Sequence, residues 1–119
     1  MTSDENFPKR EHLLKTKDFR KAYKEGRVFK KWPVFLYAIP NDLCMNRIGL
    51  SISSRNIKLA TRRNRVKRLF REAYRLNRRR LLKGFDLVLV VKQYNEKIST
   101  YKDVEKVFSG LAKESGVAA

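Results

Sequence analysis

A run of five consecutive apolar residues, Leu87 to Val91, is the sequence feature that most constrains the fold. Its length is that of a strand and far below the ~18 residues of a membrane-spanning helix. Alternate side chains of a strand point to opposite faces of a sheet, so this strand presents apolar side chains on both. We therefore predict that Phe85 to Lys92 forms a buried strand, covered by protein on both sides.

The segment before this strand, from Ala60 to Arg80, has helical periodicity. At ~100° per residue one apolar stripe contains Val66, Leu69, Phe70, Ala73 and Leu76. Before it comes a strand-like alternation from Arg47 to Ser53, with Ile48, Leu50 and Ile52 facing inward and Gly49, Ser51 and Ser53 facing outward. The small outward residues indicate that something approaches that face closely. A long helix between two strands allows them to pair in parallel.

The remaining elements complete the predicted architecture. We predict a helix over Lys17 to Glu25, capped by Thr16 and stopped by Gly26, a strand over Val34 to Ile39, and an additional strand over Arg27 to Lys30. A last amphipathic helix starts at the capping-box sequence Thr100 to Asp103. The order helix, strand, strand, helix, strand, helix predicts an α/β (α+β) two-layer sandwich, with one small mixed sheet packed against helices. The length suits one domain over residues 1–119, with a flexible basic tail at 1–11 and a frayed C-terminus at 112–119.

The charge of the chain predicts its class of partner. Lys and Arg number 29 against 12 Asp and Glu, a formal net charge of +17. An excess of this size indicates a polyanion, which could be RNA, DNA or an anionic membrane surface. Because no apolar run approaches the length of a membrane span, we predict nucleic acid and no membrane association.

The charge is concentrated on one predicted helix. Arg62 to Arg80 contains ten Lys or Arg residues and a single acid, Glu72. Like charges at helical spacing repel by a few tenths of a kcal/mol per pair. Such a helix is stabilised when phosphates neutralise it and release their counterions. The alternative is a solvated basic face that only keeps the chain soluble.

Aromatic residues form a second group. Phe19 and Tyr23 are four residues apart on the first helix, and Phe35 and Tyr37 share one face of a strand. Rings from two elements can line a groove, where aromatic faces stack unpaired bases at ~1–3 kcal/mol each. A core position remains the alternative for Phe19 and Phe35, whereas the hydroxyls of the two tyrosines favour contact with solvent or ligand.

The sequence contains no apparent catalytic constellation. A self-sufficient metal-dependent nuclease brings several carboxylates together on two ions, but the acidic residues of this chain lie on unrelated elements. His12 is the only histidine and Cys44 the only cysteine, so neither a metal-ligand cluster nor an internal disulfide is expected. The segment Met1 to Arg10 lacks the apolar core of a secretory signal. We therefore expect a cytoplasmic protein with no catalytic residue and no metal site of its own.

The segment from Ala60 to Tyr74 resembles the signature of the bacterial ribonuclease P protein family. That signature is an Arg-Asn-Arg core, followed by Lys-Arg and a further Arg one turn on, and it matches at Arg63, Asn64, Arg65, Lys67, Arg68 and Arg71. The resemblance extends from about Arg10 to Leu111. It includes Asp18-Phe19, Tyr23 ahead of Gly26, Phe35-Leu36-Tyr37, Arg47 to Ser53 and Gly84-Phe85-Asp86.

This resemblance implies a protein subunit of ribonuclease P, an RNA-containing endonuclease that matures the 5′ end of tRNA. The implied partners are the catalytic RNA and the single-stranded 5′ leader of precursor tRNA, with magnesium at the RNA active site and not on this chain. No obligate protein partner is evident. The residues assigned to the catalytic RNA are Arg62, Arg63, Asn64, Arg65, Lys67, Arg68, Arg71 and Arg75. Those assigned to the leader-binding cleft are Phe19, Tyr23, Phe35, Tyr37 and Lys92.

Two other functions fit parts of the sequence. A structural RNA-binding protein, such as a small ribosomal protein, shares the charge and the mixed fold but needs no leader-sized aromatic cleft. A protein-only nuclease requires cleavage by the polypeptide alone. The discriminating observation is whether the purified protein lowers the magnesium requirement of a bacterial ribonuclease P RNA.

Overall fold

The computed structural model describes residues 15–118, and the tail predicted at residues 1–11 lies outside them. The helices are α1 (Thr16–Glu25), α2 (Ala60–Asn77) and α3 (Tyr101–Glu114), with short 3-10 turns η3 (Arg78–Arg80) and η4 (Glu96–Ile98). The strands are β1 (Arg27–Lys31), β2 (Val34–Pro40), β3 (Arg47–Ser51) and β4 (Phe85–Val91). The predicted order of elements is confirmed, including the additional strand β1.

The four strands form one mixed sheet in the order β1-β2-β4-β3. β2 runs antiparallel to both β1 and β4, while β3 runs parallel to β4. The helix α2 therefore connects two parallel neighbours, as predicted. β4 lies between β2 and β3. Its residues Leu87 to Val91 are apolar on both faces because each face packs against a separate cluster of buried residues.

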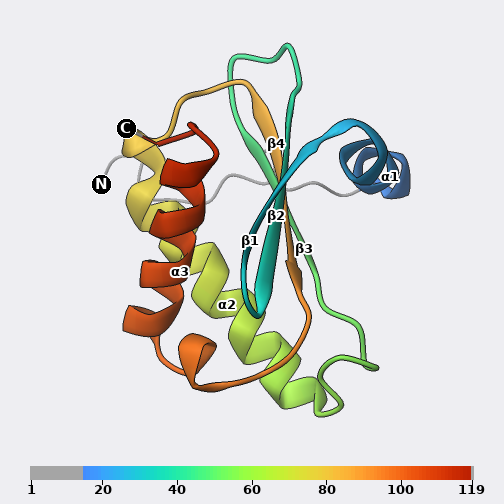
Figure 1. Cartoon of the computed structure of the whole chain (residues 1–119), viewed down its shortest axis with the longest axis vertical. Coiled ribbons are helices and arrows are strands. Elements are labelled where there is room, and N and C mark those ends of the chain that lie inside the picture. Colours follow the sequence, from blue (N-terminus) through green and yellow to red (C-terminus); the bar gives the residue numbers. More distant parts are fainter. Residues whose placement is uncertain (1–14, 119) are drawn as a thin grey trace.

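The helices cover the two faces of the sheet unequally (Figure 1). The larger core lies beneath α2 and α3, where alternate residues of β2 and β4 such as Leu36 and Leu89 pack against Phe70 and Phe108. On the other face, α1 is the only helix among residues 15–118 that covers the sheet, through a small cluster of Ala22, Ile39, Val88 and Val90. Three partly buried aromatic side chains, Phe19, Phe35 and Tyr37, pack against this cluster and belong to the candidate site.

Details of two predicted helices are wrong. The buried stripe of α2 contains Asn77 in place of the expected Leu76, which is 52% exposed. The Asn77 amide occupies a core-facing position because it donates to the carbonyl of Ala73 at 2.8 Å and contacts the Glu105 carboxylate at 3.4 Å. In α1, Thr16 is the first helical residue and does not cap the helix.

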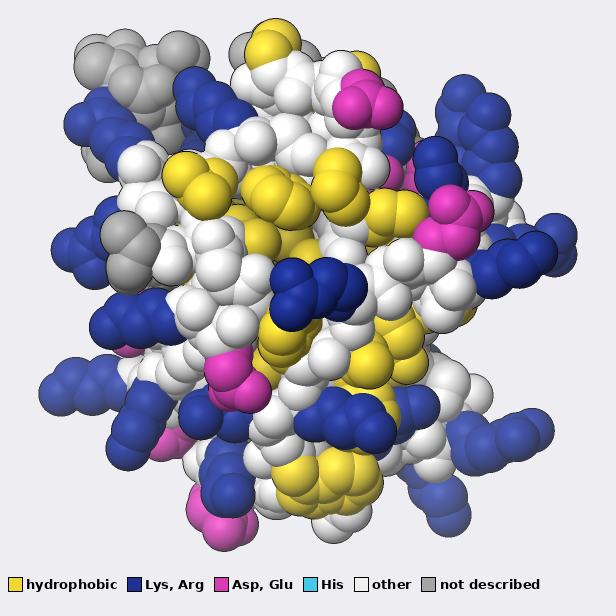
Figure 2. Space-filling model, turned by 45° about the horizontal axis from the view of Figure 1, so that its top comes forward, with side chains coloured by type: hydrophobic (Ala, Val, Ile, Leu, Met, Phe, Trp, Pro, Cys, Tyr) yellow, Lys and Arg dark blue, Asp and Glu magenta, His cyan; other side chains and the backbone are white. Residues whose placement is uncertain are grey.

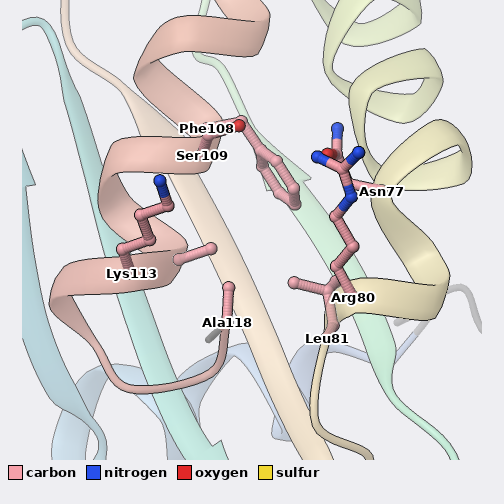
Figure 3. Close-up of a pocket in the computed structure, with 8 residues that line it drawn as sticks. Asn77, Arg80, Leu81, Phe108, Ser109, Lys113 and Ala118 are labelled. Atoms are coloured by element: carbon pink, nitrogen blue, oxygen red, sulfur yellow. The ribbon is translucent and has the colours of Figure 1, made fainter.

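The predicted fraying of residues 112–119 is also wrong for the part that is described, up to residue 118. α3 continues to Glu114, Val117 is buried, and the Leu82 amide donates to the Val117 carbonyl at 2.7 Å. Figure 3 shows Ala118 opposite Leu81, at one end of a hollow of about 230 Å³ between α2 and α3. The capping box predicted at the other end of α3 is confirmed, with the Thr100 hydroxyl accepting from the Asp103 amide.

Candidate nucleic-acid interface

The helix α2 presents a row of cations on the side away from the core. It carries seven Lys or Arg residues and one acid. Asn64, Arg68 and Arg71 are exposed and lie opposite the buried Val66 and Phe70. Figure 2 shows Lys and Arg side chains around most of the outline of the molecule, with few Asp and Glu among them. The excess charge is therefore a property of the surface, and α2 is a dense part of it.

Three of the predicted RNA-binding residues contact parts of the protein outside α2. The guanidinium of Arg62 lies 4.7 Å from the centre of the Tyr94 ring. Arg63 donates to the carbonyls of Ile57 and Lys58 at 2.8 and 3.0 Å, and Arg65 donates to the carbonyl of Ser99 at 3.0 Å. These contacts hold the segments on either side of the N-terminal end of α2, so these residues have a structural role beside any contact with RNA.

The other predicted residues of α2 differ in whether their side chains already have partners within the protein. Arg75 forms an ion pair with Glu72 one turn away. Asn64, Lys67, Arg68 and Arg71 make no side-chain hydrogen bond or ion pair within residues 15–118. We call these four residues the basic surface of α2. Their donors are available to phosphate oxygens without breaking any contact within that part of the chain.

The predicted aromatic residues converge on the opposite face of the sheet. The rings of Tyr23 on α1 and Tyr37 on β2 meet edge to face, with centroids 5.0 Å apart, and Phe19 lies 6.4 Å from Tyr23. Phe19 and Tyr37 are partly buried against the small cluster beneath α1, whereas Tyr23 is 41% exposed. The two elements thus bring rings that are far apart in the sequence into one group.

These rings border a hollow of about 320 Å³. Its lining consists of Tyr23, Tyr37, Ser51, Ser53, Asn56, Val90 and Lys92. Ser51 and Ser53 are small residues that the predicted alternation over Arg47 to Ser53 placed on the outward face. Asn56 was missed, because a lone polar residue in a loop gives no signal, yet its amide donates to the Val91 carbonyl at 3.1 Å. We call this hollow, with the neighbouring Phe19 and Phe35, the aromatic cleft.

Phe35 lies beside the hollow and does not line it. Its ring is partly buried, and the ammonium groups of Lys30 and Lys92 lie 5.0 and 5.3 Å from its centre. The Trp32 ring approaches it edge-on at 6.4 Å. Phe35 thus holds two cations at one end of the cleft.

An ion cluster fixes α1 over the sheet and so positions its rings. Arg47 on β3 donates through Nε and Nη2 to the two carboxylate oxygens of Asp86 at 2.8 and 2.7 Å, and Nη2 lies 3.5 Å from Asp18 on α1. The amide of Asn41 also donates to Asp86, at 2.9 Å. The hydrogen bond that Asp86 accepts from Arg47 raises the pKa of Arg47 above its ordinary value. Asp18, Arg47 and Asp86 are three positions within the sequence resemblance, and the structure joins them.

Two further observations bear on the class of protein. Across residues 15–118, no three His, Cys, Asp or Glu side chains are grouped so that they could hold a metal ion. In the same part of the chain, no helix combines the length and the apolar character needed to cross a membrane.

Comparison with known proteins identifies the family to which this fold belongs. The Ribonuclease P family model matches residues 7–115. A ribonuclease P protein component of Clostridioides difficile is 37% identical, over 95% of this chain and 98% of that protein, and one of Clostridium botulinum strain Loch Maree is 39% identical, over 92% and 97%. The ribonuclease P protein of Thermotoga maritima has the same fold, with a TM-score of 0.74 and 28% identity over 87% of this chain and 97% of that one. The Staphylococcus aureus protein has a TM-score of 0.81 at 24% identity, over 92% and 98%. The chain therefore belongs to the ribonuclease P protein component family.

Proposed function

We propose that this chain binds the catalytic RNA of ribonuclease P through the basic surface of α2, and the single-stranded 5′ leader of precursor tRNA in the aromatic cleft. The observation that carries the proposal is the placement of these two sites on opposite faces of one sheet. The core beneath α2 and the cluster beneath α1 use alternate residues of the same strands. One protein can therefore contact two RNA segments at once.

The chemistry of each site suits its proposed ligand. Lys67, Arg68 and Arg71 are cations with no hydrogen bond or ion pair to any of residues 15–118, which fits the binding of phosphates of a structured RNA. The cleft combines the exposed ring of Tyr23 with the ammonium of Lys92 and small polar residues. Rings of this kind stack unpaired bases with little preference for sequence, as a variable leader requires.

We propose that magnesium acts at the RNA and not on this polypeptide. The described residues do not group carboxylates in the way that a two-metal site requires, so this part of the chain does not fit the ion. The role of the chain is then to bind and orient RNA in the cytoplasm. Cleavage of precursor tRNA by protein that is rigorously free of RNA would contradict this assignment and support a protein-only nuclease.

The test of the cleft compares precursor with mature tRNA. Tyr37→Ala in the reconstituted enzyme should weaken the binding of precursor tRNA by about 1–3 kcal/mol and leave that of mature tRNA unchanged, because mature tRNA has no leader to stack. Tyr101→Ala is the control, since Tyr101 is another partly buried tyrosine and packs on the core beneath α2 and α3. Equal weakening of both substrates by stable Tyr23→Ala and Tyr37→Ala variants would contradict the assignment of these rings to the leader.

A further inference from the structure

The aromatic cleft continues beyond the strand that carries it. Phe35 lies two residues from Tyr37 on the same face of β2, a step of about 7 Å. The Trp32 ring, in the turn between β1 and β2, lies a further 6.4 Å from Phe35. The rings of Tyr23, Tyr37, Phe35 and Trp32 therefore form a row that starts on α1 and ends at the tip of the hairpin.

Trp32 is poorly explained as part of the core. It is 50% exposed, and it belongs neither to the two clusters of buried residues nor to the partly buried side chains that pack against those clusters. A half-exposed indole offers a large flat surface to solvent. Among aromatic side chains such a surface is favourable for stacking bases and attracting cations.

The surroundings of Trp32 carry charge that suits phosphates. Lys30 and Lys92 lie over the neighbouring Phe35 ring. On its other side, Trp32 borders a hollow of about 420 Å³ that includes three cations, Lys31, Lys97 and Lys106, together with the acids Glu96 and Asp103. An unpaired strand that follows the row of rings would therefore pass between cations at the tip of the hairpin.

We propose that Trp32 is an additional stacking position for the 5′ leader, separate from the one formed by Tyr23 and Tyr37. This inference rests on the proposed function of the cleft and extends it. Trp32 binds a leader nucleotide at a different distance from the cleavage site than Tyr37 does, because Phe35 separates the two rings. The surface for single-stranded RNA is accordingly longer than the hollow beneath α1.

The test measures cleavage by the reconstituted enzyme for a series of precursor tRNAs whose leaders lengthen by one nucleotide at a time. The readout is kcat/KM of the wild-type enzyme divided by that of Trp32→Ala. This ratio should stay near one until the leader reaches Trp32, and then rise by about 5- to 150-fold, the range for loss of one stacked base. For Tyr37→Ala, the corresponding ratio of wild-type to variant kcat/KM should rise at a different leader length. Trp32→Phe, which keeps a ring, should restore most of the loss.

Leu82→Ala serves as a matched control, and tryptophan fluorescence gives a direct signal of binding at Trp32. Leu82 is another large apolar side chain, 58% exposed, so Leu82→Ala should leave the ratio at one for every leader. Trp32 is the only tryptophan in the chain, so its fluorescence reports this position alone. Mixing the enzyme with precursor tRNA should quench that emission before cleavage, and mature tRNA should not.

The possible outcomes separate this inference from the proposed function. If Tyr37→Ala shows a rise with leader length and stable Trp32→Ala does not, the extension is refuted and the cleft stands. If neither variant shows a rise, both the assignment of the cleft to the leader and its extension to Trp32 are refuted. If Trp32→Ala weakens the binding of mature tRNA and of every precursor tRNA alike, the indole contacts the catalytic RNA or the tRNA body, and the inference is wrong.

Discussion

Charge removal on α2 gives the most quantitative test of how this protein docks on RNA. Lys67, Arg68 and Arg71 make no side-chain hydrogen bond or ion pair within residues 15–118, so a Lys67→Ala/Arg68→Ala/Arg71→Ala variant removes phosphate contacts without breaking contacts in that part of the chain. Each phosphate contact contributes about 0.7–0.9 to the slope of log affinity against log salt. Losing three contacts should therefore reduce the magnitude of that slope by about 2–3.

The change in slope has a large effect over an accessible range of salt. Between 50 and 200 mM salt, wild-type affinity for the catalytic RNA should fall about 20- to 40-fold more than that of the variant. The assay is filter binding or fluorescence anisotropy with labelled ribonuclease P RNA over a series of salt concentrations. Thermal unfolding should show no loss of stability, because the substitutions remove repulsion between Lys67 and Arg71 and between Arg68 and Arg71.

The control removes the same charge elsewhere. Lys83, Lys102 and Lys113 are exposed cations outside α2, and their replacement by Ala changes the net charge by the same amount. If both triple variants flatten the slope equally, the RNA senses only the net charge of the protein, and the assignment of α2 as the docking surface is refuted. An unchanged slope in the α2 variant would refute it as well.

Three further predictions concern stability. Phe70→Ala should lower the free energy of unfolding by about 3–5 kcal/mol in chemical denaturation, since Phe70 is fully buried beneath the sheet, and a loss below about 1 kcal/mol would contradict that packing. Val117→Ala should cost about 2 kcal/mol by the same assay because the C-terminal segment is docked, whereas a frayed end would cost nothing. Hydrogen bonds from Thr100 and Ser99 hold the pKa of Asp103 below its ordinary value, so its stabilisation of α3 should be complete above about pH 4 and disappear as the pH falls through the lowered pKa. The difference in melting temperature between wild type and Asp103→Asn should accordingly vanish in acid, and a difference that persists there would be inconsistent with this capping role.

The sequence was sufficient for the order of elements because local pattern and tertiary role agree in most of them. The run Leu87 to Val91 identifies the interior strand, and Thr100 with Asp103 identifies the start of α3, as the structure confirms. Leu76 and Asn77 show where the reasoning fails. Hydropathy assigns leucine to the core, but hydrogen bonds to Ala73 and Glu105 make the asparagine the better partner for α3.

The candidate site was predictable in its aromatic residues and less so in its basic and polar ones. Phe19, Tyr23 and Tyr37 share faces that simple periodicity identifies, and the structure brings them together. No local signal reveals that Arg63 and Arg65 bind backbone carbonyls, since those carbonyls belong to other segments. For the same reason, the joining of Asp18 to Arg47 depends on how α1 crosses the sheet and is visible only in three dimensions.

Few buried contacts attach α1 to the sheet, and this has a consequence for its dynamics. Among residues 15–118, this helix is held to the sheet by the buried Ala22, the partly buried Phe19 and the ion cluster at Arg47. β4 lies inside the sheet and contributes Leu87, Leu89 and Val91 to the main core. The backbone amides of α1 should therefore exchange with solvent deuterium through local opening at lower free energy than those of β4. Because a leader in the cleft would contact rings from both α1 and β2, binding and the closed position of α1 are thermodynamically linked. Leader binding should slow amide exchange in α1 and leave the exchange of β4 unchanged.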